Sequence, residues 1–195
     1  IAFITKMDSL FTMHLPDEFF AETEDVTKEG LLGGYVHGNE PSHHIPFLYA
    51  WTSQPWKTQF WQREIMNKII ATISTAFAVT TTAADVRLVY PFRHGILSGL
   101  PGYGRVCLGA PLFRKATLHF ENGKSLTIDA PDNSPENMYI ESLKVNGVDY
   151  SRNYLTHGDL LNGGTLRFDM GSQPNMKRGT QPEDYPYSFS NELKK

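Results

Sequence analysis

Hydrophobic positions in the first part of the chain recur at helical spacing. Apolar residues three and four positions apart predict a helix near the start, with a buried face made of Phe3, Met7, Leu10 and Phe11. A short apolar run over residues 45–50 carries Pro46 in its first turn, where a helix tolerates proline. Another helix is expected after Pro55, and its buried face is Trp61, Ile65, Ile69 and Ile73. Residues 1 to about 78 are therefore predicted to be helical.

Between residues 115 and 172 the apolar positions alternate, as they do in half-buried strands. Asn122-Gly123 and Asn146-Gly147 separate alternating runs, and Asn-Gly in that setting is a strong hairpin signal. A further strand is expected over residues 165–168, and one helical turn over residues 156–161, capped by Thr156. This part of the chain predicts an antiparallel β domain.

Residues 79–108 fit neither pattern. Glycines at positions 95, 99, 102 and 104 indicate loop structure. The stretch lacks the Gly-Lys-Ser/Thr ending of a phosphate-binding loop, and it lacks the dinucleotide fingerprint as well. A nucleotide site is therefore not expected here.

Composition narrows the classes of function. A chain of 195 residues that is 40% hydrophobic and 20% charged has enough apolar surface for a sizeable core in one domain or two. Its formal net charge of -3 provides no basic field for nucleic acid, and no run of 18 apolar residues is present to span a bilayer. Cys107 is its one cysteine, so an internal disulfide is excluded. Nucleic acid and membrane partners are not expected.

The densest chemistry lies at residues 37–44, which read His-Gly-Asn-Glu-Pro-Ser-His-His. A carboxylate, an amide and three imidazoles within eight positions indicate a polar site, and Trp56 follows in Gln-Pro-Trp-Lys-Thr. Tryptophan beside amide and carboxylate groups suits a sugar, which offers an apolar face and a ring of hydroxyls. The candidate substrate-binding residues are His37, Asn39, Glu40, His43, His44 and Trp56.

Other interpretations of these residues stay open. His37, Glu40 and His43 are spaced by threes and could bind zinc, although Pro41 would break an interior helix there and the spacing is not His-Glu-x-x-His. The histidines could instead support the loop, and Trp56 could be a packing residue. Trp51 and Trp61 are expected in the core.

Several blocks in order carry a resemblance to a known family. They are residues 6–11, 15–20, 35–46 and 54–58 in the first half, and residues 108–113, 120–124, 137–140 and 163–166 in the second. Together they resemble the closing part of glycoside hydrolase family 92, the calcium-dependent exo-α-mannosidases. The resemblance implies an α+β chain, in which the end of an (α/α)6 barrel over residues 1–107 is followed by an antiparallel β-sandwich-like region over residues 108–195.

The resemblance also implies an activity and its partners. It implies an inverting exo-acting α-mannosidase, with α-1,2 as the favoured linkage, that releases mannose from mannose-containing glycans with calcium in the periplasm or outside the cell. The family's N-terminal β-sandwich and the earlier part of the barrel, which supplies the general acid, would precede Ile1. As an isolated chain the protein is therefore expected to be inactive.

One segment departs from the family. Where family members carry Gly-Asn-Asp-Asp-x-Gly-Gln-Met-Ser-Ala-Trp-Tyr, which includes the expected general base, this chain carries residues 79–90, in which the Asp-Asp pair is absent. Codons chosen for residues 79–106 and read out of frame spell the family's pattern. Our hypothesis is a frameshift, in the gene or in its sequencing, over about 79–106. No catalytic residue is then assigned in this chain.

Two alternatives from other classes remain. The chain could be a non-catalytic carbohydrate-binding or interaction module, built on the β domain and the loop with Asn39 and Glu40. It could also be a metal-dependent hydrolase that uses His37, Glu40 and His43. Mannose release, sugar binding without turnover, or stoichiometric zinc would distinguish the three.

Overall fold

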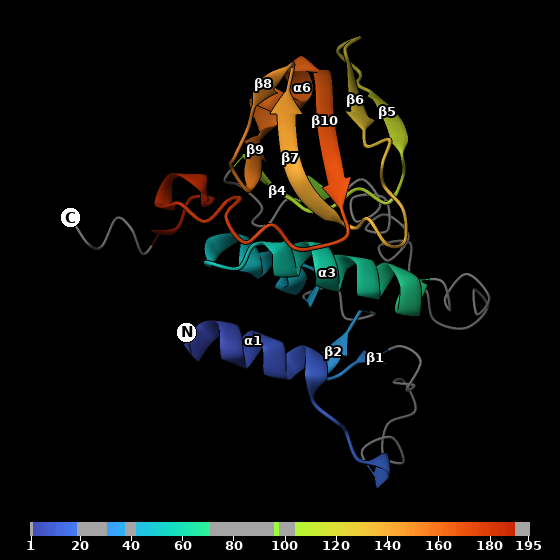
Figure 1. Cartoon of the computed structure of the whole chain (residues 1–195), viewed down its shortest axis with the longest axis vertical. Coiled ribbons are helices and arrows are strands. Elements are labelled where there is room, and N and C mark those ends of the chain that lie inside the picture. The colour runs from blue at the N-terminus through green and yellow to red at the C-terminus, as the bar shows by residue number, and fades with distance from the viewer. Residues whose placement is uncertain (1, 19–30, 38–41, 71–95, 98–103, 190–195) are drawn as a thin grey trace.

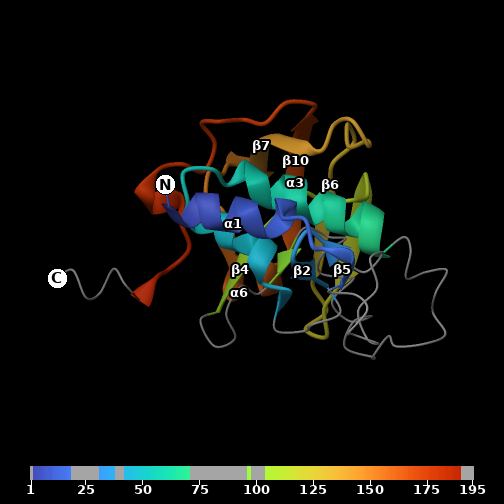
Figure 2. The ribbon, with the colours of Figure 1, turned by 90° about the horizontal axis from the view of Figure 1, so that it is seen from below.

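The fold combines a helical part, which includes a two-stranded hairpin, with two larger β-sheets. The computed structural model describes residues 2–18, 31–37, 42–70, 96–97 and 104–189. The helices are α1 (Ala2–Thr12), the 3-10 helix η3 (Ile45–Trp51) and α3 (Trp56–Ile65), which continues into the π turn η4 (Met66–Ile70). Figure 1 shows α3 between the sheets and α1, and Figure 2 shows α1 and α3 running in similar directions. The α+β prediction is confirmed at this level.

Helix α1 buries a narrower face than the sequence predicted. Met7 and Phe11 are buried, and Ile4 and Leu10 pack against the same cluster. Phe3, by contrast, is 51% exposed, so its assignment to the buried face was wrong. Successive i, i+4 steps drift around a helix of 3.6 residues per turn, and Ile4 takes the inward position in the first turn.

Helices η3 and α3 form the rest of the helical core. η3 begins with a proline in its first turn, as predicted, and buries Phe47 and Tyr49 completely. In α3, Ile65 is fully buried, and Trp61 packs against the same cluster. The side chain of Ile69, and the whole of Ile73, lie outside the described residues.

The larger sheet has five strands in the order β5-β6-β10-β7-β8. Its strands are β5 (Lys115–His119), β6 (Ser125–Asp129), β7 (Tyr139–Val145), β8 (Val148–Asp149) and β10 (Gly164–Gly171). Both predicted hairpins are present. The turn between β7 and β8 has Asn146 at φ 52° and Gly147 at φ 83°, the conformation for which Asn-Gly is preferred.

The pairing of β10 corrects the prediction of a purely antiparallel region. β10 is antiparallel to β7 but parallel to β6, with Leu166 opposite Ile128. A parallel pair needs a long crossover, and here β7, β8, β9 and α6 (His157–Asn162) provide it. Alternation along one strand does not report the direction of its neighbour, so the sequence could not reveal this. The predicted cap is present: Thr156 forms a capping box with Asp159.

A smaller sheet joins the two halves of the molecule. It has the order β3-β4-β9, with β3 (Ile96–Leu97), β4 (Arg105–Leu108) and β9 (Tyr154–Thr156). Along β4, Val106 and Leu108 belong to the apolar cluster of the sheets, whereas Cys107 belongs to that of the helices. One strand thus contributes to both cores because its side chains alternate.

Helix α3 meets the β region through buried polar side chains. The Oε1 of Gln59 accepts a hydrogen bond from Ile140 N at 2.8 Å, and that of Gln62 accepts one from Ala110 N at 3.0 Å. Arg63 Nη2 donates to Asn133 Oδ1 at 2.7 Å and to the Pro111 carbonyl at 3.2 Å. These side chains replace water for main-chain groups that the contact buries.

Gly109 is required by this contact, which gives a first prediction. A Cβ at position 109 would lie 1.8 Å from Gln62 Oε1. Gly109→Ala should displace Gln62, leave Ala110 N without its acceptor and lower the free energy of unfolding by about 1–3 kcal/mol. Urea denaturation followed by circular dichroism measures this.

The matched control is Gly158→Ala in α6. A Cβ there meets only Thr156 Oγ1, at 3.7 Å, so stability should stay equal or rise by up to about 1 kcal/mol. Equal stability of the Gly109 variant and the wild type would show that the α3 contact is not a determinant of stability.

Candidate functional site

The short hairpin of β1 (Leu31–Leu32) and β2 (Tyr35–Val36) brings His37 into the protein interior. Tyr35 is packed beneath Phe11, with ring centroids 5.2 Å apart. Its hydroxyl is hydrogen-bonded to His37 Nδ1 at 2.9 Å, and His37 is 1% exposed. A residue predicted as a sugar ligand is therefore held inside the helical core.

His43 lies next to His37 in the protein interior. It is buried, and its ring lies 4.5 Å from that of His37. Its Nε2 is hydrogen-bonded to the His37 carbonyl at 2.5 Å. A carbonyl only accepts, so the proton of the His43 ring must be on Nε2. His37 and His43 thus join the two ends of the segment that contains Asn39 and Glu40.

The remaining residues of the motif differ in position. His44 is exposed, and its carbonyl accepts the first hydrogen bond of η3, from Phe47 N at 3.0 Å. Asn39 and Glu40 lie outside the described residues, so their roles stay predictions. The zinc interpretation, which needs Glu40, stays a hypothesis for the same reason.

Burial keeps His37 from taking up a second proton. Desolvation, and secondarily the neighbouring His43, lowers the pKa of His37 to about 3. His37 is therefore neutral near pH 7, where it serves in hydrogen bonding. A group that titrates so low is too weak a base to deprotonate water efficiently at neutral pH.

Trp56, the first residue of α3, is held on two sides. The ammonium of Lys57 lies 5.6 Å from the centroid of its ring, and the ring of Tyr139 meets it edge-on at 6.3 Å. Its Nε1 is buried without a hydrogen-bond partner. These contacts make Trp56 a junction residue between α3 and β7, and a sugar could stack only on ring surface that they leave open.

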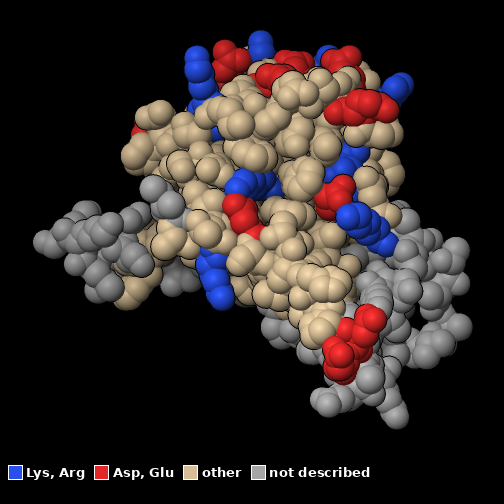
Figure 3. All heavy atoms as spheres, turned by 60° about the horizontal axis from the view of Figure 1, so that its bottom comes forward, with Lys and Arg blue, Asp and Glu red and all other residues tan. Residues whose placement is uncertain are grey.

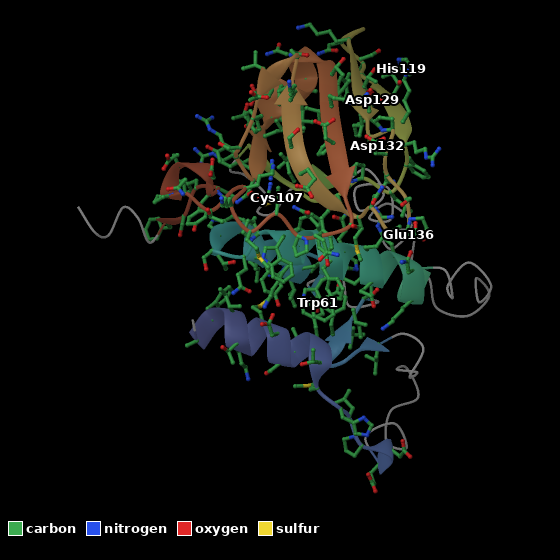
Figure 4. All side chains as sticks on the ribbon, in the orientation of Figure 1. Trp61, Cys107, His119, Asp129, Asp132 and Glu136 are labelled. Atoms are coloured by element: carbon green, nitrogen blue, oxygen red, sulfur yellow. The ribbon has the colours of Figure 1, made fainter. Side chains whose placement is uncertain are left out.

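Trp51 and Trp61 are core residues, as predicted. Trp61 stacks on Phe11 at 4.5 Å between α1 and α3, where Figure 4 labels it. Trp51 packs against the helical cluster and donates from Nε1 to the Tyr187 carbonyl at 3.0 Å.

A polar cluster around Asp8 was missed by the sequence analysis. Asp8 Oδ1 accepts a hydrogen bond from the Tyr49 hydroxyl at 2.8 Å, and its Oδ2 forms an ion pair with Lys57. Burial, together with this hydrogen bond, raises the pKa of Tyr49. Asp8 and Lys57 lie in two different segments that carry the family resemblance, residues 6–11 and 54–58. Nothing else in the sequence indicated that they form a pair. The cluster ties α1 to η3 and α3.

Charged side chains are mixed in sign over the face of the molecule that Figure 3 draws, where Lys and Arg are interspersed with Asp and Glu. Among the residues that the structure describes, no group of three or more His, Cys, Asp or Glu side chains is placed to hold a metal ion. No helix in this described part is long and apolar enough to cross a membrane. We therefore assign no calcium ligand.

The buried state of His37 predicts how stability depends on pH. An unfolded histidine binds a proton below about pH 6.5, whereas His37 in the folded chain resists it down to about pH 3. Its contribution is complete above pH 6.5 and is lost as the pH falls toward 3, by up to about 1.4 kcal/mol per pH unit. Urea midpoints measured between pH 7 and 4.5 report this loss.

Two variants isolate the effect. His37→Gln should flatten the decline of the urea midpoint, whatever its stability at pH 7, and His14→Gln, which alters an exposed histidine, should keep the wild-type slope. Identical slopes for wild type and His37→Gln would contradict the assignment.

Comparison with known proteins identifies the family to which the chain is similar. Residues 1–172 match the family model of the glycosyl hydrolase family 92 catalytic domain. An uncharacterized secreted glycosidase of Arthroderma benhamiae is 29% identical over 92% of this chain and 26% of the relative.

Solved structures agree. The family GH92 alpha-mannosidase BT3965 of Bacteroides thetaiotaomicron superposes with a TM-score of 0.81 at 33% identity, over 96% of this chain and 24% of the relative. The family GH92 inverting mannosidase BT2199 of the same organism gives 0.73 at 34% identity, over 96% and 26%. The chain thus spans about a quarter of these relatives. On the match to most of its length, the chain belongs to glycosyl hydrolase family 92 and corresponds to a part of that family's catalytic domain.

Proposed function

We propose that this chain is one part of an inverting, exo-acting α-mannosidase that releases mannose from glycans, with α-1,2-linked mannose as the first linkage to test. The observation that carries the proposal is the family match over residues 1–172, which includes the His-Gly-Asn-Glu-Pro-Ser-His-His motif. The chain spans about a quarter of its solved relatives, so a complete site would need the remaining length.

The histidine pair suggests how this part would serve the site. His37 and His43 are buried, and the ring of His43 is hydrogen-bonded to the His37 carbonyl. In our proposal they hold residues 38–41 while Asn39 and Glu40 contact sugar hydroxyls. His44, which is exposed where η3 begins, is the motif histidine best placed to reach a ligand. Trp56 contributes whatever ring surface its packing leaves free.

Inversion at the anomeric carbon requires two carboxyl groups about 6.5–9.5 Å apart, one as acid and one as base for water. In our proposal the acid comes from the earlier part of the barrel. The base comes from the family's Asp-Asp motif, and residues 79–90 stand at the position of that motif in this chain. The frameshift hypothesis accounts for the missing aspartates. Residues 79–95 and 98–103 lie outside the described residues, while Val106 is buried in β4. The isolated chain is then inactive.

The finer architecture belongs to the same proposal. We assign residues 1–107 to the end of an (α/α)6 barrel, since α1, η3 and α3 share one apolar cluster. Residues 108–195 form the β-sandwich-like region, in keeping with two sheets that share an apolar cluster. Calcium and a periplasmic or extracellular location are expected from the family, and the fungal relative is described as secreted.

A second candidate is a carbohydrate-binding or interaction module without catalysis. The β region favours it to the extent that it has its own core, which includes Phe168 and Leu166, and contains two local hairpins. Mannose binding by this chain, with no turnover after the upstream part is supplied, would favour the module.

Supplying the missing parts should restore activity. A longer protein with the frame corrected over 79–106 and the upstream barrel present should release mannose from a mannobiose, and a calcium chelator should abolish the release. The chain as given should release none, because general acid and base groups each contribute typically about 10²–10⁴-fold. Reducing-sugar release measures both. Turnover by the isolated chain would refute the assignment of its missing carboxyl groups.

Glu40 should matter in the restored enzyme. Glu40→Ala leaves a sugar hydroxyl without its acceptor, at a cost of about 1–3 kcal/mol, which lowers kcat/KM by roughly 5- to 150-fold. Glu18→Ala, a change of the same type at an exposed position, should keep wild-type kcat/KM. Equal values for both variants would remove Glu40 from the site.

A further inference from the structure

The segment after the last strand is a built element of the fold. Residues 172–189, here called the C-terminal strap, leave β10 and cross the boundary between the sheets and α3 (Figure 1). Asn175 anchors its beginning: its Oδ1 accepts from the backbone N–H of Lys177 and Arg178, and its Nδ2 donates to the Glu141 carbonyl at 3.0 Å. The family model ends at residue 172, so the strap lies beyond it.

Buried charge holds the middle of the strap. Arg178 Nη2 donates to the Arg152 carbonyl at 3.2 Å, and burial lowers the pKa of Arg178 only to about 10, so it stays charged. Asp184 is buried and accepts a hydrogen bond from the Ser151 hydroxyl at 2.5 Å. It also closes a capping box with Gln181 around the short helix η5 (Pro182–Asp184). A segment with this much internal bonding has a defined conformation.

Asn153 connects the strap to η3. It is 2% exposed, and its Nδ2 donates to the Gly179 carbonyl at 2.7 Å and to the Ala50 carbonyl at 3.2 Å. Its backbone N–H donates to the Asp184 carbonyl at 2.8 Å, and its own carbonyl accepts from Leu108 N at 2.9 Å. Through its side chain and its backbone, Asn153 thus bonds the strap, η3 and the small sheet together.

A second link lies one residue further along η3. The indole N–H of Trp51 donates to the Tyr187 carbonyl in the strap. The guanidinium of Arg105 lies 5.5 Å from the ring of Tyr187 and 5.0 Å from that of Tyr154. The end of the strap is therefore fixed against both η3 and the small sheet.

We propose that the C-terminal strap is a positioning element for η3 and, through it, for His43 and His44. η3 follows these histidines directly, and its last two residues are Ala50, which Asn153 links to the strap, and Trp51, which donates to the strap itself. Because η3 has only two turns, its orientation depends on how both ends are held. Asn153 and Trp51 are the positioning residues, and neither is proposed to touch substrate. The effect on the sugar site rests on the proposed function, whereas the strap's contact with η3 does not.

Hydrogen exchange of the 195-residue chain tests the coupling. Trp51→Phe removes one link and keeps an aromatic ring, and Asn153→Ala removes the other. Each should speed amide exchange in residues 45–52 by about fivefold or more, the factor that loss of one hydrogen bond corresponds to. Exchange in β7 should stay at the wild-type rate, because a positioning contact acts locally while a general loss of stability acts everywhere. Met176→Ala, at a strap residue that is 60% exposed, is the matched control.

Activity of the restored longer enzyme tests the consequence. Trp51→Phe there should lower kcat/KM for mannobiose by about fivefold or more, and Met176→Ala should leave it unchanged. Faster exchange in η3 with unaltered kcat/KM would overturn the positioning of the site. Unchanged exchange in η3, or equal acceleration in β7, would overturn the coupling itself. If the longer wild-type enzyme has no mannosidase activity, the proposed function is refuted. The exchange data then test only the coupling between the strap and η3.

Discussion

Hydrogen bonds from buried polar side chains of α3 to the β region determine how the two halves of this chain fit together. Gln59, Gln62 and Arg63 face inward, and their partners include main-chain groups of Ile140, Ala110 and Pro111. A buried amide N–H without an acceptor costs about 1–3 kcal/mol, so helix and sheet cannot slide against each other without losing several such bonds. Apolar packing alone would allow such sliding more readily. The positions of η3, the histidine pair and Trp56 all follow from where this contact fixes α3.

Local features of the fold were predictable from sequence, and long-range ones were not. The Asn-Gly hairpins and the cap at Thr156 depend on residues a few positions apart, so their patterns are visible in the chain. The parallel pairing of β10 with β6 depends on a crossover of intervening strands, which alternation does not encode. The prediction of which α3 residues face inward was incomplete for a related reason. Periodicity counts apolar residues, whereas Thr58, Gln59, Gln62 and Arg63 are buried there as well.

The candidate site shows the same division. Density of polar groups singled out this segment, whose role as a sugar site stays a prediction, but spacing could not tell that His43 turns inward and His44 outward. Nor could it reveal that the Asp8 carboxylate pairs with Lys57, since the two residues meet only when α1 packs against α3. Residue patterns alone left open whether this segment is a sugar site, a zinc site or a structural loop. The family resemblance favours the sugar site, and the family match supports the resemblance.

The alternation along β4 has a consequence for how the molecule could be observed. Cys107 is 2% exposed and lies in the helical cluster, on a strand whose neighbours serve the other core (Figure 4). A thiol-specific reagent reaches a sulfur in that place only when the packing around it opens. As the one cysteine of the chain, it provides a built-in reporter without any engineered label. The labelling rate, compared with that of a free thiol, would give the free energy of the opening that exposes Cys107.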